Sequence, residues 1–247
     1  DYPILEFQAP KHFYTRTQVF LDPLERVFAN PNSMFYKRRK TKPLSSSDWA
    51  NIARHWGKTT QSSVVLAAYR QALASQGQDI QLIRDFLSQL IKEDRWAEAF
   101  DFAQPLANKT KAAIDFNRLA IVAKALDVKS PSLKVPFGFV RFDKVIAQWK
   151  EALPQSWEPY YAEGVAYRDY DGQRSIAELD RASRMVVTDK SAVAVQRGRV
   201  FLELGLSLAT QAMHQKATRA FEMAIQLGSA SIKRAAAVEL AKNRIGR

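Results

Sequence analysis

An amphipathic pair of helices that recurs at a step of 34 residues constrains the fold of this chain more than any other feature of its sequence. Four apolar residues spaced as one helical face open the first pair, and four more open the second: Trp49, Ile52, Ala53 and Trp56, then Ile83, Phe86, Leu87 and Leu90. The second helix of each pair carries Val65, Tyr69 and Ala72, or Ala99, Ala103 and Leu106. One pair cannot bury its own apolar faces, so this period indicates stacked helical repeats.

The last helix pair has the most regular pattern. Its first helix reads Phe201-x2-Leu204-Gly205-x2-Leu208, and its second reads Ala217-x3-Phe221-x2-Ala224. Small residues are expected where two helices cross closely, because a larger side chain would force the backbones apart. This pattern resembles the tetratricopeptide repeat (TPR) at each expected spacing, and the resemblance covers residues 46–231.

Two further helix pairs fit the repeat with departures. One is opened by Tyr160, Gly164 and Tyr167 and continued by Ser175, Leu179 and Ala182, with Glu163 in an apolar position. The middle pair begins with Phe116, Leu119, Ala120 and Ala123 and resumes with Val145, Trp149 and Ala152. An insertion at residues 129–141 separates its two helices. We therefore predict an all-α fold, an α-solenoid of about five helix-turn-helix, TPR-like repeats with a capping helix at 231–244. An irregular all-α bundle is the alternative.

Residues 1–44 differ in composition from the remainder of the chain. They are rich in aromatic residues and proline and end in a basic cluster, Lys37, Arg38, Arg39 and Lys40. We predict an irregular aromatic and basic N-terminal arm at 1–44, followed by the solenoid domain at 45–247. The cluster suits contact with anionic lipid or another anionic polymer, or it is a linker between the arm and the solenoid.

The charge balance bears on partners more than on fold. Lys and Arg total 37 against 25 Asp and Glu, which gives a net charge of +12. Such an excess favours acidic partners, although a solubilising surface is the simpler explanation. The chain has no cysteine, so disulfides and thiolate metal sites are excluded. No run of apolar residues is long enough to span a membrane, and what preceded Asp1 stays open.

The sequence offers no convincing catalytic or metal site. The three histidines, His12, His55 and His214, are far apart and lack acidic companions at ligand spacing. Phosphate-binding, dinucleotide-binding and nucleophile motifs are absent. The carboxylate pairs Glu93/Asp94 and Asp169/Asp171 fall in predicted turns, where such residues usually cap helices. We therefore predict a protein that is not an enzyme and needs no cofactor or metal.

The resemblance implies that the first helices of successive repeats line a concave groove that holds a partner segment. Carried over position by position, its polar contacts would include Arg54, Lys58, Arg84, Lys92, Asn117, Lys124 and Arg168. The groove positions also include Gln81, Ser88, Ile121, Tyr161, Val165, Leu202 and Leu206. A basic groove would attract an acidic peptide or a free carboxylate. Ordinary solvated helix residues are the alternative.

The insertion is too apolar to stand in water unassisted. It contains Leu133, Val135, Phe137, Phe139 and Val140. It either packs on the chain's own groove or docks a partner, in which case Phe137 and Phe139 are partner-binding residues.

Together these features predict a protein–protein interaction scaffold or adaptor that binds an acidic or extended partner segment in a basic concave groove. A bacterial envelope assembly for secretion or polysaccharide export is the suggested setting, with a periplasmic or membrane-anchored location, by likeness to the family alone. The alternative is a helical-repeat binder of nucleic acid or another anionic polymer. The partner, the pathway and self-association stay open.

Overall fold

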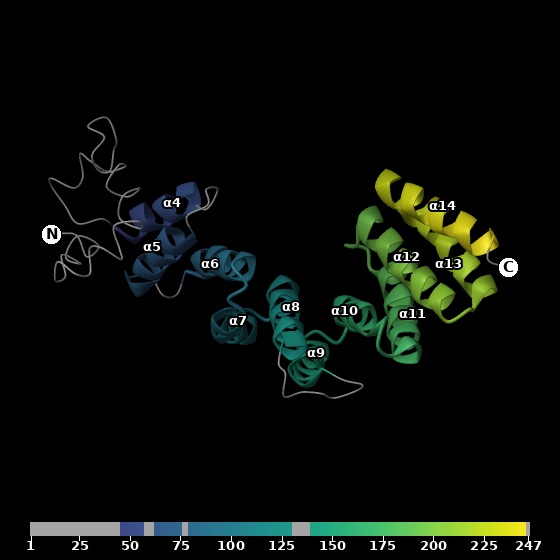
Figure 1. Ribbon diagram of the computed structural model, residues 1–247, viewed down its shortest axis with the longest axis horizontal. Helices are drawn as coiled ribbons and strands as arrows, with labels where there is room; N and C mark the ends of the chain where they lie inside the picture. The colour runs from purple at the N-terminus through teal and green to yellow at the C-terminus, as the bar shows by residue number, and fades with distance from the viewer. Residues whose placement is uncertain (1–44, 57–61, 76–78, 130–138, 246–247) are drawn as a thin grey trace. The chain divides into compact units, whose positions relative to one another are not determined.

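The computed structural model describes residues 45–56, 62–75, 79–129 and 139–245. Within these ranges all regular elements are α-helices, which confirms the predicted all-α fold class (Figure 1). They follow one another as α4 (Ser46–Trp56), α5 (Ser62–Ser75), α6 (Ile80–Lys92), α7 (Trp96–Thr110), α8 (Ala113–Lys129), α9 (Val140–Ala152), α10 (Glu158–Tyr167), α11 (Gly172–Thr188), α12 (Ala194–Thr210), α13 (His214–Leu227) and α14 (Ala230–Ile245). In the described ranges, none of these helices has the length and apolarity needed to cross a membrane.

The helices match the five predicted pairs and the capping helix. The chain also separates into two compact units, residues 1–102 and 103–247, and the division falls within α7. The arm at 1–44, with its basic cluster, lies outside the described residues, as do Lys58 and Phe137. The boundaries of the arm and of a solenoid domain at 45–247 therefore stay predictions.

In the first unit α4 packs against α5, and aromatic rings join α5 to α6 and α7. Tyr69 lies against Phe86 with ring centroids 5.7 Å apart, and Phe86 meets Phe102 edge-on at 5.1 Å. Small residues such as Ala53 and Ala72 are fully buried. All of these except Phe102 are apolar positions of the 34-residue pattern, so the periodicity located most of the core of this unit.

The second unit repeats one packing device in two of its helix pairs. A Cβ atom added at Gly205 would lie 2.5 Å from Cε1 of Phe221, and one at Gly164 would lie 2.5 Å from Cγ of Leu179. Phe221 and Leu179 are fully buried. The two glycines therefore let α12 approach α13, as the sequence pattern predicted, and α10 approach α11. Figure 1 shows α12, α13 and α14 side by side at the end of this unit.

Candidate functional site

Predicted groove residues of the first unit come together around one hollow. It has a volume of about 620 Å³ and is lined by Arg54, Tyr69, Gln81, Asp85, Ser88, Gln89 and Lys92. Because Arg54 lies on α4 and Lys92 on α6, the first helices of two successive pairs contribute to it. The hollow therefore brings together predicted groove residues from two first helices, and Tyr69 of α5 also lines it.

The charge of this hollow is more balanced than predicted. Arg54 Nε donates to Asp85 Oδ2 at 2.8 Å, and Gln81 Nε2 donates to the other oxygen of Asp85 at 2.8 Å. Arg84 and Lys92 each have an interaction partner as well. Burial raises the pKa of Tyr69, and Asp85 raises it further. A carboxylate that the sequence reasoning overlooked thus neutralises one of the expected cations.

A second pocket, of about 340 Å³, lies in the second unit and is formed largely by three first helices. Its lining comes from α8, α9, α10, α12 and the residue before α10: Ala113, Ile114, Asn117, Trp149, Trp157, Glu158, Tyr161, Val195, Gln196 and Arg199. Asn117 and Tyr161 were predicted groove residues. Trp157 meets Tyr161 edge-on with ring centroids 5.8 Å apart, which fixes one wall of the pocket.

Several hydrogen-bond donors of this pocket have no acceptor. Trp149 is 1% exposed, and its indole Nε1, which is itself buried, has no hydrogen-bond partner. Within the described ranges, the side chains of Asn117 and Arg199 make no hydrogen bond or close ion pair, although the positive charge of Arg199 acts to lower the pKa of Glu203 and of Tyr161. Burial raises the pKa of Tyr161 to about 12, with a further contribution from Glu203, so its hydroxyl keeps its proton at neutral pH. The pocket is therefore suited to a ligand that brings acceptor oxygens.

Exposed aliphatic side chains adjoin these donors. Ile114 is 53% exposed and Val195 is 39% exposed, and both line the pocket. Along α8, Ile121 and Val128 are also exposed and follow Ile114 at steps of seven residues, so they lie on the same face of the helix. Large apolar side chains clustered on one surface are typical of interaction sites.

Two further predicted cations, Lys124 and Arg168, are held by their own chain. Lys124 Nζ donates to the carbonyl of Ala166 at 3.3 Å, and burial lowers its pKa. Arg168 Nη1 lies 2.7 Å from Glu203 Oε2, and burial raises the pKa of Glu203. Arg54 with Asp85 and Arg168 with Glu203 are separated by 31 and 35 residues in sequence. Opposite charges about one repeat apart were therefore the signal that could have revealed both pairs.

Phe139 does not behave as a docking residue. It is 6% exposed, and its ring meets Phe142, Tyr167 and Tyr170 at centroid distances of 5.0–5.8 Å. Lys124 Nζ lies 5.4 Å from the centre of the same ring. This end of the insertion packs on the chain itself, because burying the ring among aromatic neighbours removes it from water. The prediction that Phe139 binds a partner is therefore corrected, because its ring is buried within the chain. Residues 130–138 lie outside the described ranges.

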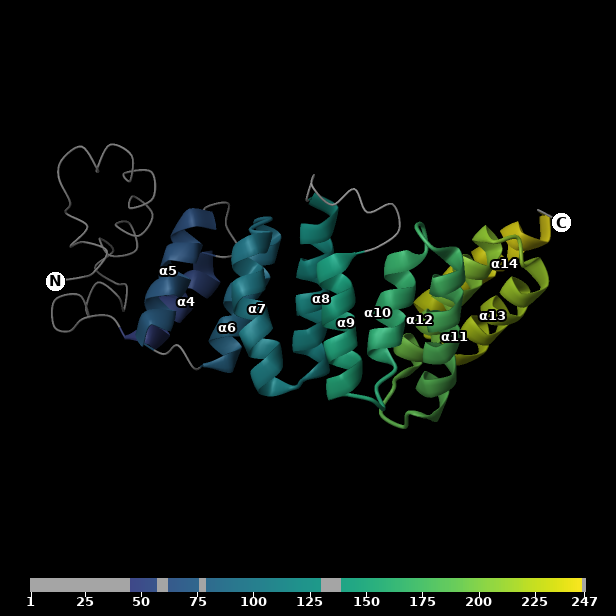
Figure 2. The ribbon, with the colours of Figure 1, turned by 90° about the horizontal axis from the view of Figure 1, so that it is seen from below.

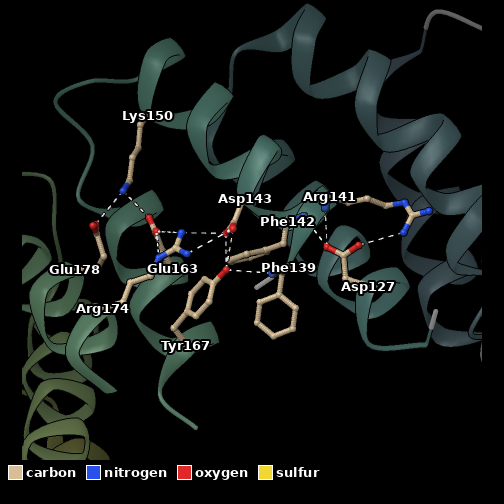
Figure 3. Close-up of polar contacts among 10 residues, drawn as sticks. All are labelled: Asp127, Phe139, Arg141, Phe142, Asp143, Lys150, Glu163, Tyr167, Arg174 and Glu178. Atoms are coloured by element: carbon tan, nitrogen blue, oxygen red, sulfur yellow. Dashed lines mark hydrogen bonds and ion pairs between the residues drawn. The ribbon is translucent and has the colours of Figure 1, made fainter. Parts of the chain in front are cut away.

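A network of charged side chains joins α9, α10 and α11 and was not predicted (Figure 3). Buried Glu163 accepts from Lys150 Nζ at 2.5 Å and from Arg174 Nε at 2.8 Å. Arg174 also reaches Asp143 at 3.0 Å, and the Tyr167 hydroxyl donates to Asp143 at 2.7 Å. Lys150 additionally contacts Glu178 at 2.9 Å. Two cations are thus bridged by three carboxylates, and this cluster fastens three helices together.

A carboxylate of α8 fixes the start of α9. Asp127 Oδ2 accepts from the backbone N–H groups of Arg141 and Phe142 at 2.8 and 3.0 Å (Figure 3). Negative charge is favoured at a helix N-terminus, because the first N–H groups of a helix have no partner within it. The carboxylate thereby ties the helix that follows the insertion to α8.

The carboxylate pairs and histidine considered for catalysis have structural partners. Asp171 accepts from the backbone N–H of Arg174 at 3.0 Å and caps α11. Glu93 accepts from Gln89 at 2.9 Å, and His214 Nδ1 lies 2.8 Å from Asn243 Oδ1. Among the described residues, no three acidic or histidine side chains gather as metal ligands would.

Comparison with known proteins gives a likeness of structure and none of sequence. No family model and no curated protein matches the sequence. TTC0263, a thermophilic TPR protein in Thermus thermophilus, matches with a TM-score of 0.51 at 12% identity, over 80% of this chain and all of that one. MamA matches with a TM-score of 0.51 at 11% identity, over 73% of this chain and 90% of that one. The APC/C hetero-tetramer Cut9–Hcn1 matches at 0.52 and 12% identity, over 88% of this chain and 40% of that one. At these identities the likeness concerns the fold alone.

Proposed function

Starting from the TPR-like helical-repeat fold of this chain, we propose that it is a non-enzymatic scaffold that holds a segment of a partner protein. The segment lies against the first helices of the second unit, and the pocket between α8, α10 and α12 is its main contact. A chain of this fold serves in the Cut9–Hcn1 hetero-tetramer, where it assembles with another protein. That assembly is consistent with the proposal.

The observation that carries the proposal is the combination of free donors and exposed aliphatic residues in one pocket. The exposed side chains of Asn117 and Arg199 offer N–H groups, while Ile114 and Val195 offer apolar surface. A polypeptide segment supplies both complements, since its carbonyl or carboxylate oxygens accept hydrogen bonds and its side chains cover aliphatic surface. A catalytic site would instead need convergent ionisable groups with perturbed pKa values.

The charge distribution favours a protein partner over an anionic polymer. Arg54 and Arg168 are paired with Asp85 and Glu203, so two of the expected basic contacts carry little net charge. A nucleic-acid groove would be expected to leave its cations unpaired for successive phosphates. The bacterial envelope setting and a contact of the Lys37–Lys40 cluster with anionic lipid remain proposals that rest on the sequence.

Affinity capture from the native host tests the proposal. The substitution pair Ile114→Asp with Arg199→Glu alters the pocket at two exposed positions. Val238→Asp with Arg234→Glu on α14 makes the same chemical change, and Val238 is 54% exposed, close to the 53% of Ile114. We expect the wild-type chain and the α14 variant to capture the same protein and the pocket variant to lose most of it.

The result that would overturn the proposal is equal capture by all three forms. Capture of nuclease-sensitive nucleic acid, with binding that falls steeply as salt rises, would establish the alternative function instead.

A further inference from the structure

The second unit contains another hollow besides the pocket between α8, α10 and α12, which we call the first-helix pocket. The two have no lining residue in common. It has a volume of about 500 Å³ and is lined by parts of α11, α12 and α13: Ile176, Ala177, Asp180, Ser183, Phe201, Leu204, Leu208, Lys216, Arg219, Ala220 and Met223. Figure 2 shows α11 and α13 near one another beside α12. The hollow thus lies between two second helices, with α12 as its floor.

The floor of this hollow is apolar, and each of its two walls carries a large apolar side chain. Phe201, Leu204 and Leu208 of α12 form the floor and keep 9%, 7% and 5% of their surface exposed. Ile176 on α11 and Met223 on α13 are half-buried and stand on opposite walls. Methionine adapts its shape to different neighbours, which suits a surface that accepts another polypeptide.

The rim is basic and its cations are unpaired. Lys216 and Arg219 are exposed, and neither makes an ion pair or hydrogen bond with another described residue through its side chain. Asp180 is the acidic group of the lining, and it is paired with Arg184. Two free positive charges one helical turn apart therefore border an apolar floor, and the complementary ligand carries carboxylates beside apolar side chains.

We propose that this hollow is a separate docking site for an acidic amphipathic helix of a partner protein. Apolar side chains of the helix cover Leu204, Leu208 and Met223, and its carboxylates meet Lys216 and Arg219. Another copy of this chain fits less well, since its net charge is +12 and like charges repel. With the first-helix pocket, the site lets one scaffold hold two partner segments at once.

Selection from a displayed library of random 16-residue peptides tests this site without a known partner. This length is chosen because about 16 residues form four helical turns. The immobilised wild-type chain is the bait. The affinity of the selected peptides is then measured for the double variant Lys216→Glu with Arg219→Glu. The control is Lys233→Glu with Arg234→Glu on α14, which makes the same charge change at two side chains that are also exposed. Met223→Ser probes the apolar wall, and circular dichroism checks that each variant is folded.

We expect a class of selected peptides that combine Asp or Glu with Leu or Phe at helical spacing. Their affinity should fall roughly tenfold or more with the Lys216/Arg219 and Met223 variants, and should weaken as salt increases, but stay unchanged with the α14 control. These peptides should also bind the Ile114/Arg199 variant normally, which separates this site from the first-helix pocket. The inference is overturned if no selected peptide distinguishes Lys216→Glu with Arg219→Glu from the α14 control.

Discussion

At the scale of single residues, Gly205 shows how closely the last helix pair is packed. A methyl group there would meet Cε1 and Cδ1 of buried Phe221 at 2.5 and 2.6 Å, and the ring cannot move without disturbing its neighbours. We expect Gly205→Ala to lower the free energy of unfolding by about 1–3 kcal/mol in urea denaturation. Gly172→Ala is the control, because its methyl group would meet only the flexible end of Gln211. A loss no larger than that of the control would contradict this packing.

Glu163 is the residue on which the charged network depends. Its side chain is 5% exposed and accepts from both Lys150 and Arg174. We expect Glu163→Gln to destabilise the protein by about 2–3 kcal/mol, since two cations would lose a charged acceptor in a partly buried site. Glu178→Gln removes a single contact of Lys150 from a carboxylate with 22% exposure, so its loss in thermal denaturation should be clearly smaller. Equal losses of stability for the two variants would show that the network does not depend on Glu163 more than on Glu178.

Because of Tyr161, the free energy of unfolding depends on pH in the alkaline range. Burial raises its pKa from 10.0 to about 12 in the folded chain. Between pH 10 and 12 the folded state keeps a proton that the unfolded state has lost, so the contribution of this group is complete below pH 10 and disappears as pH approaches 12. We expect Tyr161→Phe to reduce the decline of unfolding free energy over that window. An unchanged decline would contradict the raised pKa.

The sequence alone predicted the structural roles of some of these residues but not of others. Gly205 and Phe221 stood at spacings that imply a close helix crossing, and Glu163 stood out as a charge in an apolar position. The partners of Glu163 could not be predicted in the same way, because Lys150 and Arg174 come from neighbouring helices and their geometry depends on how those helices pack. The free indole N–H of Trp149 was likewise invisible, since an amphipathic pattern records only that the residue is buried.

At the scale of elements, the turns within two regular pairs share one hydrogen-bond pattern. After α12, Met213 N–H donates to Leu208 C=O at 2.9 Å and Ala212 N–H donates to Ala209 C=O at 3.0 Å. After α6, Arg95 and Asp94 make the equivalent bonds to Leu90 and Ile91. Both turns are Schellman motifs, which close a helix by placing one residue in the left-handed region.

Ala212 occupies that left-handed position with φ 56°, which glycine adopts at lower cost. We expect Ala212→Gly to raise the free energy of unfolding by about 0.5–1 kcal/mol. Ala209→Gly, three residues earlier and inside α12, should instead lower it by about 1 kcal/mol. The two substitutions are compared by urea denaturation, and the same sign for both would refute this assignment of strain.

The positions of the helices were the most predictable feature of this chain. Apolar periodicity located the paired helices from α4 to α13 and the capping helix α14, because burial of one face imposes a fixed spacing. The surface charges were less predictable, since Asp85 and Glu203 neutralise arginines from a neighbouring repeat. The apolar insertion left two options open, and burial of Phe139 favours packing on the chain itself at that end.

At the scale of the whole molecule, a net charge of +12 coexists with ion pairs between neighbouring repeats in each of the two units. Cations at the first helices are partly paired, whereas Arg199 stands beside aliphatic surface and Lys216 and Arg219 border an apolar hollow. The proposed specificity for a protein partner rests on these few exposed cations beside apolar surface, in keeping with how interfaces concentrate their binding energy.

Site-specific photocrosslinking in the native host tests the central claim most directly. A photoreactive amino acid placed at Asn117 lies in the first-helix pocket, and one placed at Lys233 lies on the exposed surface of α14. We predict that position 117 forms a covalent adduct with one defined segment of a partner protein, and that Ile114→Asp with Arg199→Glu abolishes this adduct while position 233 gives none. Adducts with the same yield from both positions, or adducts with nucleic acid alone from position 117, would contradict the claim that this chain is a protein-binding scaffold.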